Sequence, residues 1–259
     1  MNFLKLSFIV FYFSIYFSIS VAFSFENTFH IVLDPGHGGH DLGAVRDSFV
    51  EAKIVFQITQ KIKFQLDQKK NITTTLTRTE TQGLSLKERV ILANKLKADL
   101  FVSLHANTSN SKSMNGMEFY FNSNSPKNIS LSSNSAKLKN QALTHAEVIE
   151  KIKKDFQFYD KTENSLLLTK AFKSAQEKNV SLKNPKKNRI RRAPFYVIDH
   201  TAMPSALIEL GFITNRREAK KLTTEEHQNE MAQLITAAIL EYKEKTQEMR
   251  DKPESLQEE

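Results

Sequence analysis

The chain has 259 residues, of which 40% are hydrophobic and 25% are charged, as in a soluble globular protein with one large domain or two small ones. It has no cysteine, which excludes disulfides and thiolate metal sites, so any metal must be held by histidine, aspartate or glutamate. The 37 basic residues outnumber the 29 acidic ones, and the net charge of +8 favours anionic surfaces such as a cell wall or a membrane.

Residues 1–24 predict an export signal. The uncharged apolar run at 6–23 follows a single lysine, and Ala22 and Ser24 fit the small-x-small pattern of a cleavage site before Phe25. A retained membrane anchor is the alternative, because the run has the length of a short transmembrane helix, about 18 residues. Serine residues within the run weaken it and favour cleavage. We therefore expect an exported protein located in the periplasm, which disfavours nucleic acid as a partner.

Apolar runs rich in β-branched and aromatic residues predict the strands of one sheet. These runs lie at 30–34, 73–78, 100–106, 116–121, 195–199 and 205–212. Helical periodicity is found at 50–66, at 85–99 and at 224–243. The second of these helices begins with a capping box formed by Ser85 and Glu88.

Alternating strands and helices predict an α/β fold. We expect a single domain at residues 25–243, with a mostly parallel central sheet of about six strands flanked by helices. Residues 244–259 form a charged C-terminal tail that is expected to fray.

The region 122–163 interrupts this alternation of strands and helices and is predicted to be an inserted loop and helix. Its first part is rich in asparagine, serine and lysine, and a polar loop of this length inside a domain is usually functional or disordered. A short amphipathic helix at 144–156 follows, with Thr144 and Glu147 as its capping box. Its apolar face consists of Val148, Ile149, Ile152 and Phe156.

Two histidines stand at the ends of predicted strands. His37 follows the first strand within the glycine-rich stretch "IVLDPGHGGHDLGAV", and His105 ends the strand "LFVSLHAN". The stretch does not fit the dinucleotide-binding pattern G-x-G-x-x-G, because Asp41 stands where the third glycine would be. A lone histidine at such a place is more often a satisfied core residue, but two of them at the ends of two strands are harder to explain in that way and favour a ligand site.

Two glutamates stand in apolar surroundings. Glu51 lies one turn before the apolar stripe of the helix at 50–66 and on the same side, so it projects inward. A stabilising contact with the helix dipole is the simpler explanation, but it needs no inward projection. Glu209 lies inside the apolar strand "SALIELGF", and a glutamate is almost never buried without a partner. An exposed edge strand is the alternative for Glu209, and the apolar residues on both sides of it argue against that.

Together these residues supply two imidazoles, one carboxylate and a second, free carboxylate. Three protein ligands with one open position are the arrangement of catalytic zinc, and Glu209 would then accept the proton of a zinc-activated water. The serine-hydrolase motif G-x-S-x-G is absent.

These residues and motifs resemble the zinc-dependent N-acetylmuramoyl-L-alanine amidases, the amidase-3 family of peptidoglycan hydrolases. The likeness runs in order through "IVLDPGHGGHDLGAV", Glu51, "ADLFVSLHAN" and "MPSALIELGFITN", from about residue 30 to about residue 242. The resemblance implies one Zn²⁺ per chain held by His37, Glu51 and His105, with Glu209 as the catalytic residue. It implies cleavage of the amide between N-acetylmuramic acid and L-alanine of the stem peptide, in cell-wall remodelling or daughter-cell separation.

The inserted region resembles one found in amidases of Gram-negative cell division, in which a helix covers the zinc until an activator removes it. The resemblance implies that Glu147 or Glu150 is an autoinhibitory zinc ligand and that a periplasmic activator protein acts on 122–163. The alternative is a helix packed on the side of the domain with both glutamates in solvent. The substrate-binding candidates are Asn107, Arg191 and Arg192. Arg191 or Arg192 could hold a substrate carboxylate, and an exposed, solvated face is the simpler explanation for either arginine.

Two other functions remain open at this stage. One is a zinc peptidase that cuts the stem peptide itself, and the other is a wall-binding protein without catalysis. The intact set of four residues argues against the second, and the family motifs argue against the first.

Overall fold

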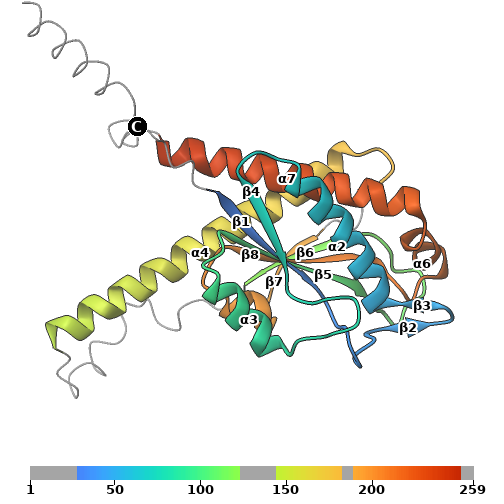
Figure 1. Ribbon diagram of the computed structural model, residues 1–259, viewed down its shortest axis with the longest axis horizontal. Helices are drawn as coiled ribbons and strands as arrows, with labels where there is room; N and C mark the ends of the chain where they lie inside the picture. Colours follow the sequence, from blue (N-terminus) through green and yellow to red (C-terminus); the bar gives the residue numbers. More distant parts are fainter. Residues whose placement is uncertain (1–27, 123–143, 183–188, 252–259) are drawn as a thin grey trace, which may run out of the picture.

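A six-stranded sheet forms the centre of the computed structural model, which describes residues 28–122, 144–182 and 189–251 (Figure 1). The strand order is β4-β1-β5-β8-β6-β7. The strands are β1 (Phe29–Pro35), β4 (Ile72–Leu76), β5 (Leu100–Asn107), β6 (Glu118–Asn122), β7 (Arg189–Ala193) and β8 (Ser205–Phe212). All neighbouring pairs are parallel except β6 with β8. The predicted α/β fold with a mostly parallel sheet is confirmed.

Helices cover both faces of the sheet, and the alternation of apolar residues along β1 shows why. Ile31 and Leu33 belong to a large core beneath α2 (Glu51–Asp67), α4 (His145–Lys178) and α7 (Glu225–Asp251). Val32 points the other way, into a smaller core beneath α3 (Leu86–Lys95) and α5 (Tyr196–His200). Successive side chains of a strand face opposite sides of the sheet, so one buried strand contributes side chains to both cores.

Three short elements were not predicted from the sequence. They are the two-stranded ribbon of β2 (Val45–Arg46) and β3 (Phe49–Val50), and the helix α6 (Arg216–Leu222).

The predicted strand at 195–199 is wrong. This segment forms the short helix α5, in which the adjacent residues Val197 and Ile198 both enter the smaller core. Two adjacent apolar residues are compatible with a strand and with a helix, so the local sequence pattern could not decide between these two structures. The strand missing from the prediction is β7, whose sequence RIRRA has no apolar run. Its charge suits an edge strand, where it discourages pairing with another chain.

The helix predicted at 144–156 begins with the expected capping box at Thr144 but continues to Lys178. Its C-terminal half packs on α7 and the sheet, while its N-terminal half extends beyond the sheet (Figure 1). The apolar side chains on that half are exposed, Phe156 by 73%. The structure therefore matches the predicted alternative in leaving Glu147 and Glu150 exposed, but it does not pack the apolar face against the domain.

The last helix is also longer than predicted. Residues 244–251, expected to fray, continue α7 as far as Asp251. The rest of the predicted tail and the predicted export signal at 1–24 lie outside the described residues. Within the described part of the chain, no helix combines the length and the apolar character needed to cross a membrane.

Substitution of Phe172 by alanine should destabilise the protein by about 3–5 kcal/mol, because its ring is fully buried and stacks on Phe119 at 6.0 Å between centroids. Urea unfolding followed by circular dichroism measures this loss. Phe156→Ala, on the projecting half of the same helix, is the matched control and should change stability by no more than about 0.5 kcal/mol. Equal losses would show that the projecting half is packed in solution.

Candidate metal centre

The turn after β1 holds its histidine in an unusual backbone conformation. His37 has φ of 59°, in the left-handed region that residues with a side chain seldom adopt. Gly38 follows with φ of 109°, and its N–H donates to the carbonyl of Asp41 at 2.7 Å. Such a conformation persists only where the surroundings hold it.

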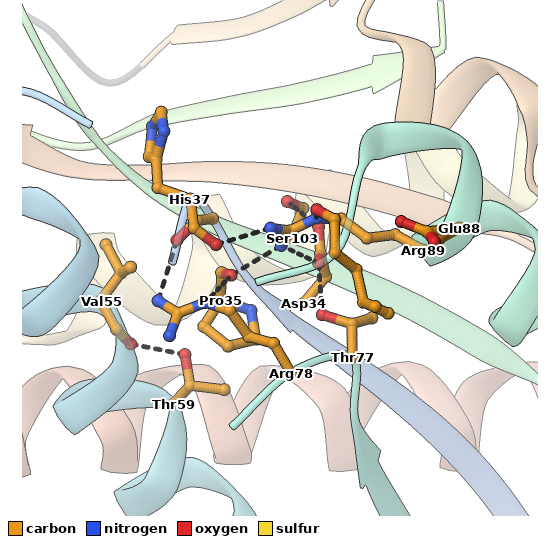
Figure 2. A network of polar contacts seen from close by, with 12 residues as sticks. Asp34, Pro35, His37, Val55, Thr59, Thr77, Arg78, Glu88, Arg89 and Ser103 are labelled. Carbon is orange, nitrogen blue, oxygen red and sulfur yellow. Dashed lines mark hydrogen bonds and ion pairs between the residues drawn. The ribbon is translucent and has the colours of Figure 1, made fainter. Parts of the chain in front are cut away.

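Two arginines hold this turn by its carbonyl groups (Figure 2). Arg78 donates to the carbonyls of Pro35 at 2.8 Å and Gly36 at 2.9 Å. Arg89 donates to the carbonyls of Pro35 at 2.8 Å and His37 at 2.6 Å. Both arginines are buried, and burial lowers the pKa of Arg78 to about 10. The turn is therefore fixed through its backbone by charged donors, one from the segment after β4 and one from α3.

The carboxylate of Asp34 balances this charge. It is 1% exposed and accepts from Arg89 at 2.7 Å, from Ser103 at 2.7 Å and from the hydroxyl of Thr77 (Figure 2). A buried charge is costly unless it is paired and hydrogen-bonded, and this one has an ion-pair partner and two hydroxyl donors.

Three candidate ligands converge above this turn. Glu51 begins α2, and its Oε1 lies 3.1 Å from Nε2 of His37 and 3.0 Å from Nδ1 of His105. One ligand atom from each residue lies within 4.8 Å of the other two. The structure thus brings together the three residues that the sequence singled out as ligands, from the turn after β1, from α2 and from β5.

Glycines beside the cluster leave room for its rings. A Cβ atom on Gly36 would lie 2.2 Å from Cε1 of His105, and one on Gly43 would lie 2.6 Å from Cδ2 of His37. These positions tolerate no side chain while the imidazoles keep their places. The glycines at 36 and 43 therefore allow the close packing of the two histidine rings.

The donor set fits a divalent transition metal. Nitrogen and carboxylate oxygen donors suit zinc, and imidazoles that bind metal usually donate their second N–H to an oxygen. Nδ1 of His37 has such a partner in Asp41, at 2.8 Å, which leaves Nε2 for a metal. Glu51 is also held, because its Oε1 accepts from the amide of Ala106 at 3.0 Å and its Oε2 from that of Ala44 at 2.9 Å.

The charges of the cluster fit a cation as well. The hydrogen bond with Glu51 raises the pKa of His37 to about 9, against the opposing effect of its burial. Burial would raise the pKa of Glu51, but hydrogen bonds with His105 and His37 lower it far below the ordinary value. The ionised carboxylate thus favours a proton on the imidazole of His37, and a metal ion would take the place of that proton.

Glu209 stands beside this cluster on the next strand. It pairs in register with His105 across β5 and β8, so both side chains lie on the same face of the sheet. Its Oε2 is buried and has no hydrogen-bond partner. Burial raises the pKa of Glu209 to about 7. This carboxylate can therefore exchange a proton near neutral pH with a group placed between it and the cluster.

A second buried glutamate, Glu118, was missed in the sequence. It stands opposite Glu209 in the antiparallel pair of β6 and β8 and is 5% exposed. Its Oε2 accepts from Asn107 at 3.0 Å and from Tyr120 at 2.7 Å, and its Oε1 pairs with Arg191 at 3.3 Å. The signal was available, because Glu118 also stands within an apolar run, GMEFYF.

The substrate-binding candidates separate in space. Asn107 and Arg191 both contact Glu118 on the site face of the sheet. Arg192 points to the other face, where its guanidinium lies 5.2 Å from the ring centre of Phe121. Direct contact of Asn107 or Arg191 with substrate stays a prediction.

The two candidate autoinhibitory residues make contacts within their own helix. Glu147 accepts from the backbone and the hydroxyl of Thr144 in the capping box, and Glu150 pairs with Lys154 at 3.5 Å. Among the described residues, the metal-ligand cluster consists of His37, Glu51 and His105 without either of them. The structure gives the autoinhibitory contact no support, and it stays a prediction.

Comparisons with known proteins agree on one family. Residues 31–241 match the family model of the N-acetylmuramoyl-L-alanine amidases. The chain is 32% identical over 221 residues to the amidase AmiC of Escherichia coli O6:H1, covering 82% of this chain and 52% of AmiC. It is 29% identical to the amidase LytC of Bacillus subtilis, covering 82% of this chain and 35% of LytC. It thus spans about half or less of the length of these two relatives.

Solved structures give the same result. The chain is similar to an N-acetylmuramoyl-L-alanine amidase from Clostridium difficile 630, with a TM-score of 0.66 and 28% identity over 84% of this chain and 98% of that one. It is also similar to the catalytic domain of CwlV from Bacillus (Paenibacillus) polymyxa var. colistinus, with a TM-score of 0.60 and 31% identity over 83% of this chain and 98% of that one.

Asp41→Asn should weaken Zn²⁺ binding roughly 10- to 100-fold, because an amide orients His37 less well and lacks the charge that raises its basicity. Competition with a fluorescent chelator measures the affinity. Asp47→Asn is the control, since Asp47 is an aspartate six residues further along the chain that pairs with Arg216 at 4.0 Å instead of with a histidine of the cluster. Unchanged affinity in Asp41→Asn would remove Asp41 from the site.

Glu209 should make the metal-free protein less stable as pH rises. Its folded pKa of about 7, raised by burial above the ordinary 4.5, means that the folded state binds this proton more tightly than the unfolded state. The stabilisation is therefore complete below pH 4.5 and is lost between pH 4.5 and 7, by up to about 3 kcal/mol. Thermal unfolding measured from pH 4 to 8 should show that the stability of Glu209→Gln rises relative to that of the wild type between pH 4.5 and 7. A constant difference between the two proteins would contradict the raised pKa.

Proposed function

The chain belongs to the N-acetylmuramoyl-L-alanine amidase family, and on this premise we propose that it is a zinc-dependent peptidoglycan hydrolase. It cleaves the amide bond between N-acetylmuramic acid and L-alanine of the stem peptide. One observation carries this proposal: the unpartnered Oε2 of Glu209 lies on the same sheet face as His105, next to a compact set of three metal donors.

His37, Glu51 and His105 would hold the zinc ion, one per chain. When bound, zinc lowers the pKa of a water ligand to about 7 and polarises the scissile carbonyl. The protein contributes a preorganised donor set, since the turn that carries His37 is clamped by Arg78 and Arg89. Glu51 is likewise fixed by two backbone amides before any metal arrives.

Glu209 acts as the general base and then as the general acid. Its carboxylate accepts a proton from the attacking water while the water oxygen forms a bond to the amide carbon. It then delivers that proton to the leaving nitrogen as the carbon–nitrogen bond breaks, which releases a lactyl carboxylate and the amine of L-alanine. Burial raises the pKa of Glu209 to about 7 in the metal-free protein, and a raised pKa suits a group that must both accept and donate a proton near neutral pH.

The proposed catalytic domain spans residues 25–243, and the protein acts on peptidoglycan outside the cytoplasm. Export rests on the signal predicted at 1–24 and agrees with a cell-wall substrate, and the periplasm is the proposed compartment. Remodelling of the wall or separation of daughter cells is the proposed role. A periplasmic activator that acts on the insert at 122–163 is part of the proposal and rests on the resemblance alone.

Two substitutions should separate the ligand from the base. His105→Ala should lose zinc together with activity, because a third of the donor set is gone. Glu209→Gln should keep zinc yet lose activity by roughly 10²- to 10⁴-fold, because the proton acceptor is removed and the ligands are not. Metal content is measured by mass spectrometry of the purified proteins, and activity by mass spectrometry of digested muropeptides with and without chelator.

The products decide between the proposed reaction and its alternatives. Release of intact stem peptides that begin with L-alanine supports the amidase, whereas shortened peptides would indicate a zinc peptidase. Binding to peptidoglycan without any product would indicate a wall-binding protein. Loss of zinc from Glu209→Gln would make Glu209 a ligand and overturn its role as base.

A further inference from the structure

We infer that Arg191 binds the free carboxylate of the second residue of the stem peptide, so that the peptide extends from the metal centre across β8, β6 and β7. This inference deepens the proposed function and rests on it. It assigns a direction to the substrate, a specificity for carboxylate over carboxamide, and a role to one arginine of β7.

Strand register places Arg191 in line with the reaction site. His105 pairs with Glu209, Glu209 pairs with Glu118, and Tyr120 pairs with Arg191. Glu118 and Tyr120 lie two residues apart on β6 and so share a face of the sheet. All these side chains therefore lie on one face, in a row that leads from the metal cluster to the edge strand.

The guanidinium of Arg191 is only partly engaged. One nitrogen lies 3.3 Å from Glu118, and the side chain is 40% exposed. Glu118 itself is held by Asn107 and Tyr120, so it fixes one end of the guanidinium in place. A guanidinium has five N–H donors arranged as a fork, so donors remain for a bidentate contact with a ligand carboxylate.

The adjacent arginine of β7, Arg192, cannot take this part. Arg192 lies on the opposite face of β7, over the ring of Phe121. The sequence made Arg191 and Arg192 equivalent candidates, and strand alternation separates them. Arg192 is therefore a control of the same charge, one residue away.

Distance selects the second residue of the peptide. Neighbouring strands are about 4.8 Å apart, so the backbone of β7 lies roughly 10 Å from that of β8, which carries Glu209. The side chain of Arg191 shortens this gap, because it reaches back to Glu118 on the strand between. An extended peptide advances about 3.5 Å per residue, so groups of the second residue reach roughly 7 Å from the scissile nitrogen. In stem peptides this residue is glutamate joined through its γ-carboxyl group, with its α-carboxylate free, or isoglutamine, in which that group is an amide.

The opposite side of the cluster suits the uncharged glycan. A pocket of about 560 Å³ adjoins His37 and His105 there, between the glycine-rich turn and the segment that enters α3. Leu84 and Leu86 contribute to its wall. The arginine that lines it, Arg89, already donates to Asp34 and to three backbone carbonyls, so at most one of its five N–H groups is left and it cannot bind a substrate carboxylate through two parallel bonds.

The test measures kcat/KM for each of two substrates with each of three enzymes. The substrates are disaccharide muropeptides that differ only in the second residue, D-glutamate or D-isoglutamine. The enzymes are the zinc-loaded wild type, Arg191→Gln and the control Arg192→Gln. We expect the wild type and the control to prefer the carboxylate substrate roughly 10- to 100-fold in kcat/KM. Arg191→Gln should lose this preference, because its KM rises more for the carboxylate substrate than for the amide substrate.

Each remaining outcome has one meaning. A wild type that cleaves both substrates equally well overturns the inference and leaves the amidase function intact. Equal losses of Arg191→Gln on both substrates also overturn it, since that result assigns Arg191 to the support of Glu118. A wild type that cleaves neither substrate overturns the proposed function. Arg191→Lys, which keeps the charge without the fork, should show a reduced preference, and zinc content and melting temperature confirm that each variant is folded.

Discussion

The site depends on one buried carboxylate, that of Asp34. It sits at the end of β1 with an exposed fraction of 1%, where a lone charge would be strongly unfavourable. Its ion pair with Arg89 makes burial of both charges tolerable, and Arg89 uses its other donors on carbonyls of the turn that follows. The backbone of the turn is thereby held in a conformation that local preferences would not select, and His37 is aimed at the cluster.

The division of the core into two layers explains how the rest of the site stays in place. The large core beneath α2, α4 and α7 fixes α2 through residues such as Ile54, Ile58 and Ile62, and Glu51 extends from the first turn of that helix. The smaller core beneath α3 and α5 lies on the face that carries His105 and Glu209. The ligands are thus carried by elements anchored in separate layers, and they meet at the carboxyl ends of the parallel strands, where ligands bind in such sheets.

The antiparallel placement of β6 has a chemical consequence. It brings the beginning of β6 to the sheet edge at which the parallel strands end, so Glu118 stands opposite Glu209. Like charges in such cross-strand pairs are destabilising, and the two carboxylates are accommodated in different ways. Glu118 is satisfied by Asn107, Tyr120 and Arg191, while Glu209 keeps an oxygen without a partner and has its pKa raised by burial. The difference in partners leaves Glu209 free for proton transfer.

Local pattern in the sequence was enough for features that depend on neighbours along the chain. The strand ends at His37 and His105, the inward offset of Glu51, the isolated charge of Glu209 and the capping boxes at Ser85 and Thr144 all follow from periodicity or from short-range hydrogen bonds. Other features depended on contacts between distant segments. The apolar pair in α5 became a helix because both side chains enter one core, and the basic edge strand β7 exists because β6 offers it a partner. The pairing of Asp41 with His37 spans only four residues, but it depends on the geometry of a turn that is held by Arg78 and Arg89 from other parts of the chain. The placement of Glu118 beside Glu209 and the separation of Arg191 from Arg192 likewise follow from strand register, which no local pattern encodes.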